Sequence, residues 1–220
     1  MSCFGGFFSP LSYFILANVP FTALGIGAVI LGLSILLTPS APIPRKAVTA
    51  LIEGSVANLE LILEEFGLIA KGYYMANPDG SVYAYIPLSK DVGKPKLPTP
   101  PRGIITNIDG KPYLTLIPPA SELVKVEEGS SLEASISEAL VDQTELCESV
   151  SVFEGDETIL VEARGVRGHV GAGRFRQVLG SLEASIAATI AAKITGFPVY
   201  VESEEDSGKH RRIRLRTCKT

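Results

Sequence analysis

The chain has few of the residues on which most catalytic and metal sites depend. Its 220 residues include three cysteines, two histidines and no tryptophan. Cys3, Cys147 and Cys218 are odd in number and form no Cys-x-x-Cys pair, so the sequence indicates neither a disulfide framework nor a zinc knuckle. The two histidines lie in no metal-ligand spacing. We therefore predict no catalytic residue, no metal site and no cofactor.

Charged side chains are absent from the first 44 residues. Within this stretch Val19–Leu37 is nearly all apolar, close to the ~20 residues that cross a bilayer as a helix. A cleaved signal peptide is disfavoured, because no basic residue precedes a run longer than a typical signal core. We predict a membrane anchor over residues 1–38, with one span at about 20–37 after an aromatic interfacial lead-in. A tight hairpin broken near Pro10 or Pro20 is the alternative.

A Pro-rich spacer of residues 39–45 follows this span, and the first positive side chains are Arg45 at its end and Lys46 directly after it. Cytoplasmic flanks of membrane helices carry an excess of lysine and arginine. We therefore expect a single-pass protein of the cell membrane, whose residues 4–37 contact lipid and whose soluble domain faces the cytoplasm.

The charge of the remaining chain is unevenly distributed. Residues 45–163 hold 9 lysines and arginines against 19 acidic residues, whereas residues 164–220 hold 11 against 5. Such asymmetry indicates either a partner surface at the basic end or two regions that pack together, and we favour the second. Scarce Asn, Gln, Met and Cys beside 15 prolines are typical of a thermophile protein.

Residue periodicity predicts an α+β domain over residues 46–220. Apolar residues at steps of three and four predict an amphipathic helix over 46–66. Turn sequences at Asn77–Gly80 and Asp109-Gly110 each separate two β-prone runs, which predicts two hairpins. The proline-rich stretch at about 89–102 is predicted to be an extended loop.

The last hundred residues contain an internal echo. Ser131–Ile136 recurs identically as Ser181–Ile186, and each copy lies in a helix-like segment followed by two β-prone runs. This order predicts a mainly antiparallel sheet with helices on one face. It also favours repeated helix–strand–strand units, although six common helix residues can match by chance.

Several features together resemble uncharacterised archaeal membrane-anchored proteins. These are the apolar span, the spacer, the helix residues Asn58–Glu65, the run Tyr83–Pro87 and the stretch Ala191–Val199. The resemblance covers about residues 17–88 and 175–202. It implies an anchored α+β domain and no particular activity.

The stretch Arg164–Arg176 is rich in glycine and arginine and precedes a predicted helix over 175–194. Glycine-rich backbone and a helix N-terminus favour anions, and arginines add charge-assisted hydrogen bonds. The spacing matches neither the P-loop nor the dinucleotide fingerprint. A solvated loop is the alternative. The candidate anion-binding residues are Arg164, Arg167, Gly171, Gly173, Arg174 and Arg176.

The C-terminal run alternates, with Arg212, Arg214 and Arg216 on one strand face. We predict that Val201 pairs with Ile213, which places Glu202 opposite Arg212. Ion pairs would then neutralise part of the positive charge. Nucleic-acid binding is not expected, because no aromatic stacking residues accompany the arginines.

These observations predict a protein that acts by binding. The leading hypothesis is a membrane-anchored scaffold, or an accessory subunit of a membrane complex, with a protein partner or a second copy of itself. An anionic-ligand or nucleotide sensor that uses residues 164–176 is the alternative. An enzyme of unknown class is third.

Overall fold

The computed structural model describes residues 19–37, 45–89, 95, 101, 103–119, 121, 129–167 and 173–219. The chain forms two compact units, Met1–Ala47 and Val48–Thr220. The predicted aromatic lead-in, most of the spacer, most of the proline-rich loop and Gly171 lie outside the described residues.

The first unit contains the helix α2, Val19–Leu37, which has no charged residue. Large apolar side chains along it are exposed, with Leu24 at 71% and Leu31 at 66%. Among the described residues, one stretch, Gly173–Thr195, is long and apolar enough to cross a membrane, and 83% of its apolar window is buried in the protein. That stretch is therefore a core element, whereas Ala23–Ser34 of α2 is a shorter apolar helix.

The second unit is an α+β fold with one antiparallel sheet of eight strands. The strand order is β3-β4-β2-β1-β7-β8-β6-β5, so four hairpins lie side by side. Both predicted hairpins are confirmed, at β1/β2 and β3/β4. The strands are β1 Tyr73–Ala76, β2 Val82–Pro87, β3 Ile105–Ile108, β4 Lys111–Leu116, β5 Ser149–Glu154, β6 Thr158–Arg164, β7 Val199–Ser207 and β8 His210–Thr217.

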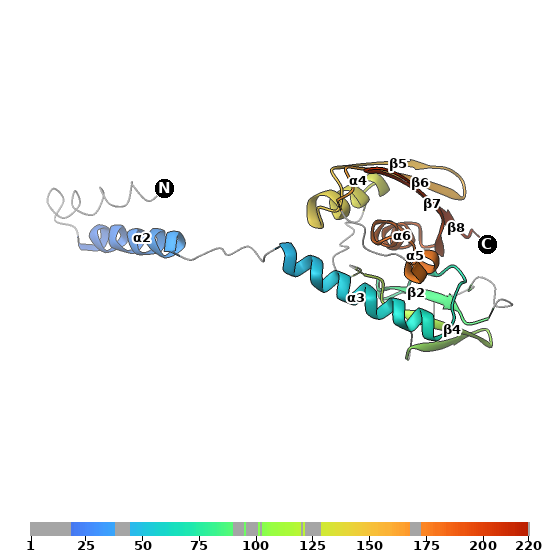
Figure 1. The fold of residues 1–220 in the computed structure, drawn as a ribbon. Coiled ribbons are helices and arrows are strands. Elements are labelled where there is room, and N and C mark those ends of the chain that lie inside the picture. The colour runs from blue at the N-terminus through green and yellow to red at the C-terminus, as the bar shows by residue number, and fades with distance from the viewer. Residues whose placement is uncertain are drawn as a thin grey trace. The chain divides into compact units, whose positions relative to one another are not determined.

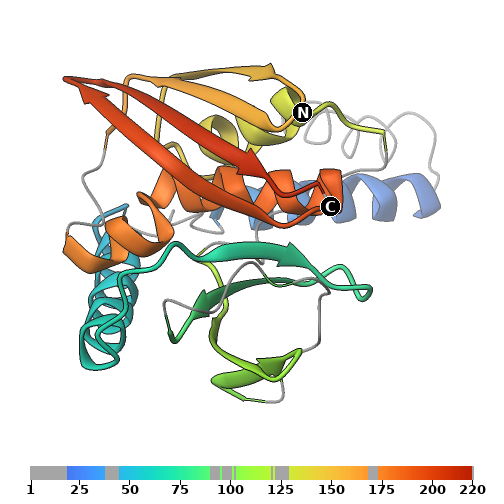
Figure 2. The same cartoon turned by 90° about the vertical axis from the view of Figure 1, so that its right-hand side faces the viewer.

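The helix α6, Leu182–Thr195, forms the centre of the second unit. Figures 1 and 2 show the sheet curving around it, with β5–β8 on one side and β1–β4 on the other. Every residue of α6 from Leu182 to Ala192 is buried. Its apolar side chains share one core with one face of the strands. The small alanines of α6 let the strands approach it closely, which explains how one helix can serve both halves of the sheet.

Further helices contribute to the same core. They are α3 Arg45–Glu65, α4 Leu132–Ser137, the π-helical turn η1 Glu138–Gln143 and α5 Gly173–Leu179. The amphipathic helix predicted over 46–66 is confirmed as α3. It ends before Gly67, whose φ of 61° suits a residue without a side chain.

The repeated hexapeptide begins two helices in the same way. Ser131 and Ser181 are the N-caps of α4 and α6, and each hydroxyl accepts a 3.2 Å hydrogen bond from the backbone N–H three residues later. The continuous helix predicted over 175–194 is wrong, because α5 ends at Leu179 and α6 begins at Leu182, after its N-cap Ser181. Gly180 has a φ of 87°, and a Cβ there would lie 3.0 Å or less from Glu204 and Val201.

The predicted register of the last hairpin is also wrong. Val201 pairs with Leu215 rather than with Ile213, and a bulge follows it in β7. The bulge adds one residue to β7, which shifts the pairing of every residue between it and the turn. Arg212 therefore lies opposite Glu205.

Candidate functional site

The structure separates the predicted glycine- and arginine-rich segment into two places. Arg164 ends β6 and is exposed, while Gly173, Arg174 and Arg176 begin α5. Residues 168–172, which include Gly171, lie outside the described residues. The described members of the segment therefore form no single loop site, and each must be considered with its own neighbours.

The start of α5 is already occupied by an anion from the protein itself. The backbone N–H groups of Arg174 and Phe175 both donate hydrogen bonds to the carboxylate of Glu60 in α3. Gly173, with a φ of 73°, lies against the same carboxylate, so a side chain at this position would collide with it. Arg174 also donates through Nη1 to the carbonyl of Leu68, at 3.3 Å. Glu60 thus caps the helix at the point where an external anion was expected.

Replacing Glu60 by alanine is expected to lower the free energy of unfolding by about 1–2 kcal/mol, because two partly buried backbone donors lose their acceptor. Chemical denaturation of the full chain in detergent measures this change. The matched control is Glu64→Ala, an exposed glutamate in the same helix, which should change stability by less than about 0.5 kcal/mol. Equal effects of the two substitutions would contradict the capping role.

A chain of ion pairs joins α5, β7, β8 and α6. Arg176 donates to Glu204 at 3.2 Å and to Asp206 at 2.6 Å. Asp206 also accepts from Arg211 at 2.7 Å, and Arg211 contacts Glu183 at 2.5 Å. Glu204 accepts from the backbone N–H of the α6 N-cap at 2.6 Å. Arg176 is therefore a structural group as well as a surface cation.

Burial shifts the pKa values of the carboxyl groups in this network of ion pairs. The side chains of Glu183 and Arg211 are 2% and 4% exposed. Burial raises the pKa of Glu183, and the charge of Arg211 opposes that rise. For Asp206 burial would raise the pKa, but the hydrogen bonds of Arg211 and Arg176 outweigh it and hold the pKa below its ordinary value. The three carboxylates of this network thus lie against two fixed guanidinium groups, those of Arg176 and Arg211.

Cys147 is a buried core residue rather than a nucleophile. It is 1% exposed and follows the π-helical turn η1. Burial, and then the charge of Glu183, raise the pKa of its thiol from 9.0 to about 11, against the opposing charge of Arg167. A thiol with so high a pKa carries almost no thiolate at neutral pH, and the thiolate is the reactive form.

At pH 9 we expect Cys147 in the folded protein to resist iodoacetamide while the half-buried Cys218 reacts, as peptide mass spectrometry can show. The folded-state pKa lies above the unfolded one, so the stability contribution of Cys147 is complete below pH 9.0 and is lost as pH rises towards 11. Cys147→Ala should therefore lose less stability than the wild type over that window. Equal labelling of both cysteines in the native protein would contradict the burial argument.

Another predicted arginine, Arg167, forms two long, exposed ion pairs. It lies 3.6 Å from Glu145 and 3.9 Å from Glu148, and all three side chains are about half exposed or more. Exposed ion pairs of this kind contribute little to the free energy of unfolding, about 0–1 kcal/mol. The Arg167 side chain therefore contributes little to the stability of the fold.

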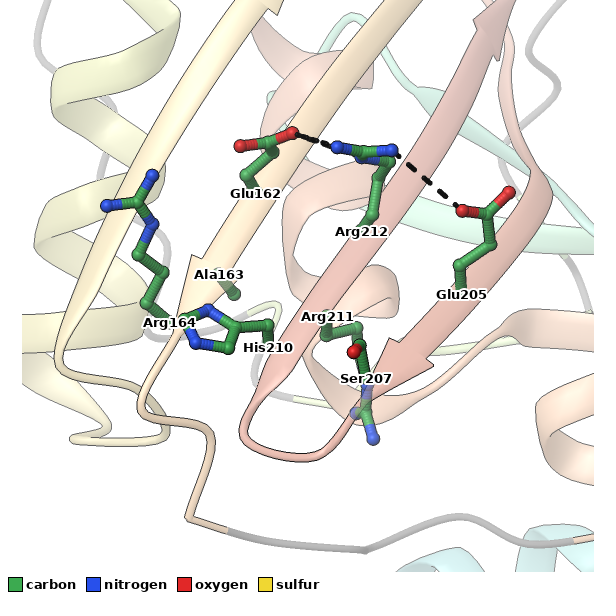
Figure 3. A pocket seen from close by; sticks show the side chains of 8 residues that line it. All are labelled: Glu162, Ala163, Arg164, Glu205, Ser207, His210, Arg211 and Arg212. Atoms are coloured by element: carbon green, nitrogen blue, oxygen red, sulfur yellow. Dashed lines mark hydrogen bonds and ion pairs between the residues drawn. The ribbon is translucent and has the colours of Figure 1, made fainter.

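Arg164 lines a hollow on the outer face of the sheet, whereas Gly173 and Arg176 line a second hollow of about 280 Å³ together with Lys71, Gln177 and Glu204. The hollow at Arg164 has a volume of about 320 Å³ and lies where β6, β7 and β8 meet (Figure 3). His210, the cross-strand neighbour of Arg164, lies beside it, and Ser207 lies opposite His210 on β7. The other lining residues are Glu162, Ala163, Glu205, Arg211 and Arg212.

The acidic residues of the hollow are engaged by one arginine. Arg212 lies 2.9 Å from a carboxylate oxygen of Glu162 and 4.0 Å from one of Glu205. Both contacts appear in Figure 3, at the end of the hollow away from His210. The residues around Arg164 therefore form the more positive end of the hollow.

Sequence reasoning identified Arg164 and Arg212 but missed Ser207 and His210. The alternation of the last strand was visible in the sequence. The juxtaposition of Ser207, His210 and Arg164 depends on the register of three strands, and the bulge in β7 hides that register.

The described residues contain no group of three His, Cys, Asp or Glu side chains that could hold a metal ion. Comparison of the chain with protein-family models, with curated proteins and with solved structures finds no match.

Proposed function

We propose that this protein is a membrane-anchored binding protein, a scaffold or accessory subunit, that recruits a protein partner or a second copy of itself through a sheet edge. The observation that supports this function best is the edge strand β3. It is the last strand on its side of the sheet, and its sequence Ile-Thr-Asn-Ile contains no charge. Exposed isoleucines surround it: Ile104 at 61%, Ile105 at 53% and Ile117 at 61%.

The opposite edge is better protected. The strand β5 is covered in part by α4, because Glu133 accepts a 3.4 Å hydrogen bond from the backbone N–H of Val152. Natural proteins block sheet edges with charges, prolines or covering elements, because an open edge pairs readily with another strand. The contrast favours β3 as the edge that a partner extends.

The membrane anchor in this proposal is α2. Its 19 residues carry no charge, and the large apolar side chains described within Ala23–Ser34, such as Leu24 and Leu31, are exposed. Exposed apolar surface of this extent is unfavourable in water and favourable in lipid. The arginine and lysine that follow it support a cytoplasmic second unit.

We also infer that the second unit is built from repeated helix–hairpin units. In the order α3-β1-β2, α4-η1-β5-β6 and α5-α6-β7-β8, helices precede each hairpin, and β3/β4 is an inserted hairpin. The identical serine caps of α4 and α6 support this reading. An open sheet of such units has an edge strand at each end, here β3 and β5, and the scaffold function needs one of these edges.

The test is purification of the full chain from native membranes in mild detergent, followed by mass measurement of the complex. We expect a stoichiometric complex with another protein or with itself. Ile105→Lys should disrupt that complex, because a lysine on an edge strand opposes pairing. The matched control, Phe153→Lys on the β5 edge, changes another exposed apolar residue (57%) and should leave it intact.

Two results would contradict the scaffold function. In the first, the wild-type chain purifies alone as a monomer. In the second, Ile105→Lys and Phe153→Lys have the same effect, which would assign the association to general surface hydrophobicity rather than to β3.

A sensor of small anionic ligands is the second candidate function. The specific observation in its favour is Arg164 in the hollow of the outer sheet face. Arg174 and Arg176 contact groups of the protein itself, so we place the candidate site at the β6 end of the predicted segment.

A further inference from the structure

The outer face of β6, β7 and β8 carries an arginine whose charge no described carboxylate neutralises. Each of the arginines 167, 176, 211, 212 and 216 has at least one carboxylate within 4.0 Å. Among the residues that the structure describes, Arg164 forms no such pair, although it is exposed at the end of β6. Arg214 is likewise without a described carboxylate partner, but it does not line the hollow.

Two further hydrogen-bonding groups lie near Arg164. His210 pairs with Arg164 across the β6–β8 ladder, and Ser207 pairs with His210 across the β7–β8 ladder. All three residues lie at the same end of their strands, and Figure 3 shows His210 beside the base of the Arg164 side chain, whose guanidinium extends away from His210 and Ser207. Guanidinium, imidazole and hydroxyl groups are each hydrogen-bond donors to an oxyanion.

The charge balance favours an anion over a cation at this end. Glu162 and Glu205 line the hollow, but both face Arg212, which pairs with each of them. Arg211 also lines the hollow, and its guanidinium contacts Glu183 and Asp206. Among the described residues that line the hollow, Arg164 is therefore the arginine with no carboxylate within 4.0 Å.

The size of the hollow limits the ligand. A volume of about 320 Å³ is at the small end of the range for ligand pockets, roughly 300–1,000 Å³. It admits a phosphoryl group with a short organic substituent and is too small to enclose a dinucleotide. Guanidinium groups bind phosphate oxygens through two parallel N–H donors, which makes phosphate a better match than a monovalent anion.

We propose that the hollow lined by Arg164, Ser207 and His210 binds a small phosphate monoester. This inference deepens the second candidate function and is independent of the scaffold function, because the β3 edge and the hollow share no residue. The phosphate can belong to a soluble metabolite or to a lipid headgroup, and the two sources present the same dianion to Arg164.

The test is calorimetric titration of the full chain in non-ionic detergent with glycerol 3-phosphate, and in parallel with a short-chain phosphatidic acid. We expect saturable one-to-one binding of at least one probe. Binding of the first probe alone assigns a soluble source, and binding of the second alone a lipid. Arg164→Ala should weaken binding by about tenfold or more, the loss of one charge-assisted contact. His210→Gln should weaken it by a smaller factor.

The matched control is Arg214→Ala, which removes an unpaired arginine from the same sheet face outside the hollow. It should leave the affinity within about twofold, since surface charges a Debye length away are largely screened. The proposal is overturned if neither probe binds the wild type, or if Arg164→Ala and Arg214→Ala weaken binding equally. Ile105→Lys should not affect phosphate binding, so failure here is distinct from failure of the scaffold function.

Discussion

Arg211→Met is expected to lower the free energy of unfolding by about 3–5 kcal/mol, the largest effect of any arginine in the strand β8. Arg211 is 4% exposed and contacts Glu183, which is 2% exposed, at 2.5 Å. Removing the guanidinium leaves a buried carboxylate without its countercharge. Urea denaturation of the full chain in detergent measures the loss.

The matched control is Arg212→Met, one residue away on the opposite face of the same strand. Arg212 is 55% exposed and pairs with carboxylates at the surface. Its replacement should cost less than about 1 kcal/mol. A similar cost for the two substitutions would show that the buried pair contributes no more than a surface pair.

The double variant Glu183→Leu with Arg211→Met distinguishes the effect of an unpaired buried charge from the effect of lost side-chain packing. Replacing both partners by apolar groups removes the uncompensated charge, so much of the lost stability should return. Asp206 keeps Arg176 as a partner in this variant. If the double variant has a lower free energy of unfolding than Arg211→Met, the unpaired charge of Glu183 is not the cause of the stability that Arg211→Met loses.

The pH dependence gives a further check on Arg211→Met. Burial raises the pKa of Glu183 above its unfolded value, and removing Arg211 takes away the group that opposes this rise. A carboxyl group with a raised folded-state pKa stabilises the fold at low pH and loses that contribution as pH rises through the folded pKa. The loss of unfolding free energy that Arg211→Met causes, relative to the wild type, should therefore be smaller at pH 5 than at pH 8.

Two lysines in the middle of α2 are expected to release the protein from membranes. Ala28→Lys with Leu31→Lys places two charges on one helix face, three residues apart. Each lysine at the centre of a membrane helix costs about 2.5–3.5 kcal/mol, so the pair opposes insertion by roughly 5–7 kcal/mol. We expect the variant in the soluble fraction or in aggregates, and the wild type in the membrane pellet after alkaline washing.

The control for this experiment keeps the positions and the apolar character. Ala28→Leu with Leu31→Ala exchanges the two side chains and should remain with the membrane. An unchanged distribution of the lysine variant would contradict the anchoring role of α2. The second unit should unfold at the same denaturant concentration in the lysine variant and in the control, because neither variant alters a core residue of residues 48–220.

The local parts of the fold could be predicted because local sequence determines them. The turn at Asn77–Gly80 and the turn at Asp109-Gly110 both form, since Gly80 and Gly110 supply the positive φ values of 81° and 77°. The helix α3 follows from apolar spacing alone. The identical hexapeptides at Ser131 and Ser181 form identical serine caps, because an N-cap depends on four neighbouring residues.

The same hexapeptides also show where local sequence stops being informative. Glu133 in the first copy is exposed and bonds to an edge strand, whereas Glu183 in the second is buried against Arg211. The two glutamates have identical neighbours from two residues before to three residues after. Their environments differ because α6 is enclosed by the sheet and α4 lies at its edge, which only the tertiary arrangement determines.

The candidate site was predictable only in part for the same reason. The arginines at 164 and 176 were conspicuous in the sequence, but their partners lie 28 or more residues away in the chain or across strands. Glu60, which caps α5, is 114 residues from Arg174. No periodicity connects such residues, so sequence could nominate the arginines and could not assign which of them remains unpaired.

Protease accessibility of the second unit in sealed membrane vesicles tests the anchoring by α2 and the side of the membrane together. We expect the full chain to stay with the vesicles after alkaline washing. We further expect protease to remove residues 48–220 from inside-out vesicles and to spare them in intact, right-side-out cells. Recovery of the wild-type chain in the soluble fraction, or digestion only from the outer side, would contradict a cytoplasmic binding domain held at the membrane by α2.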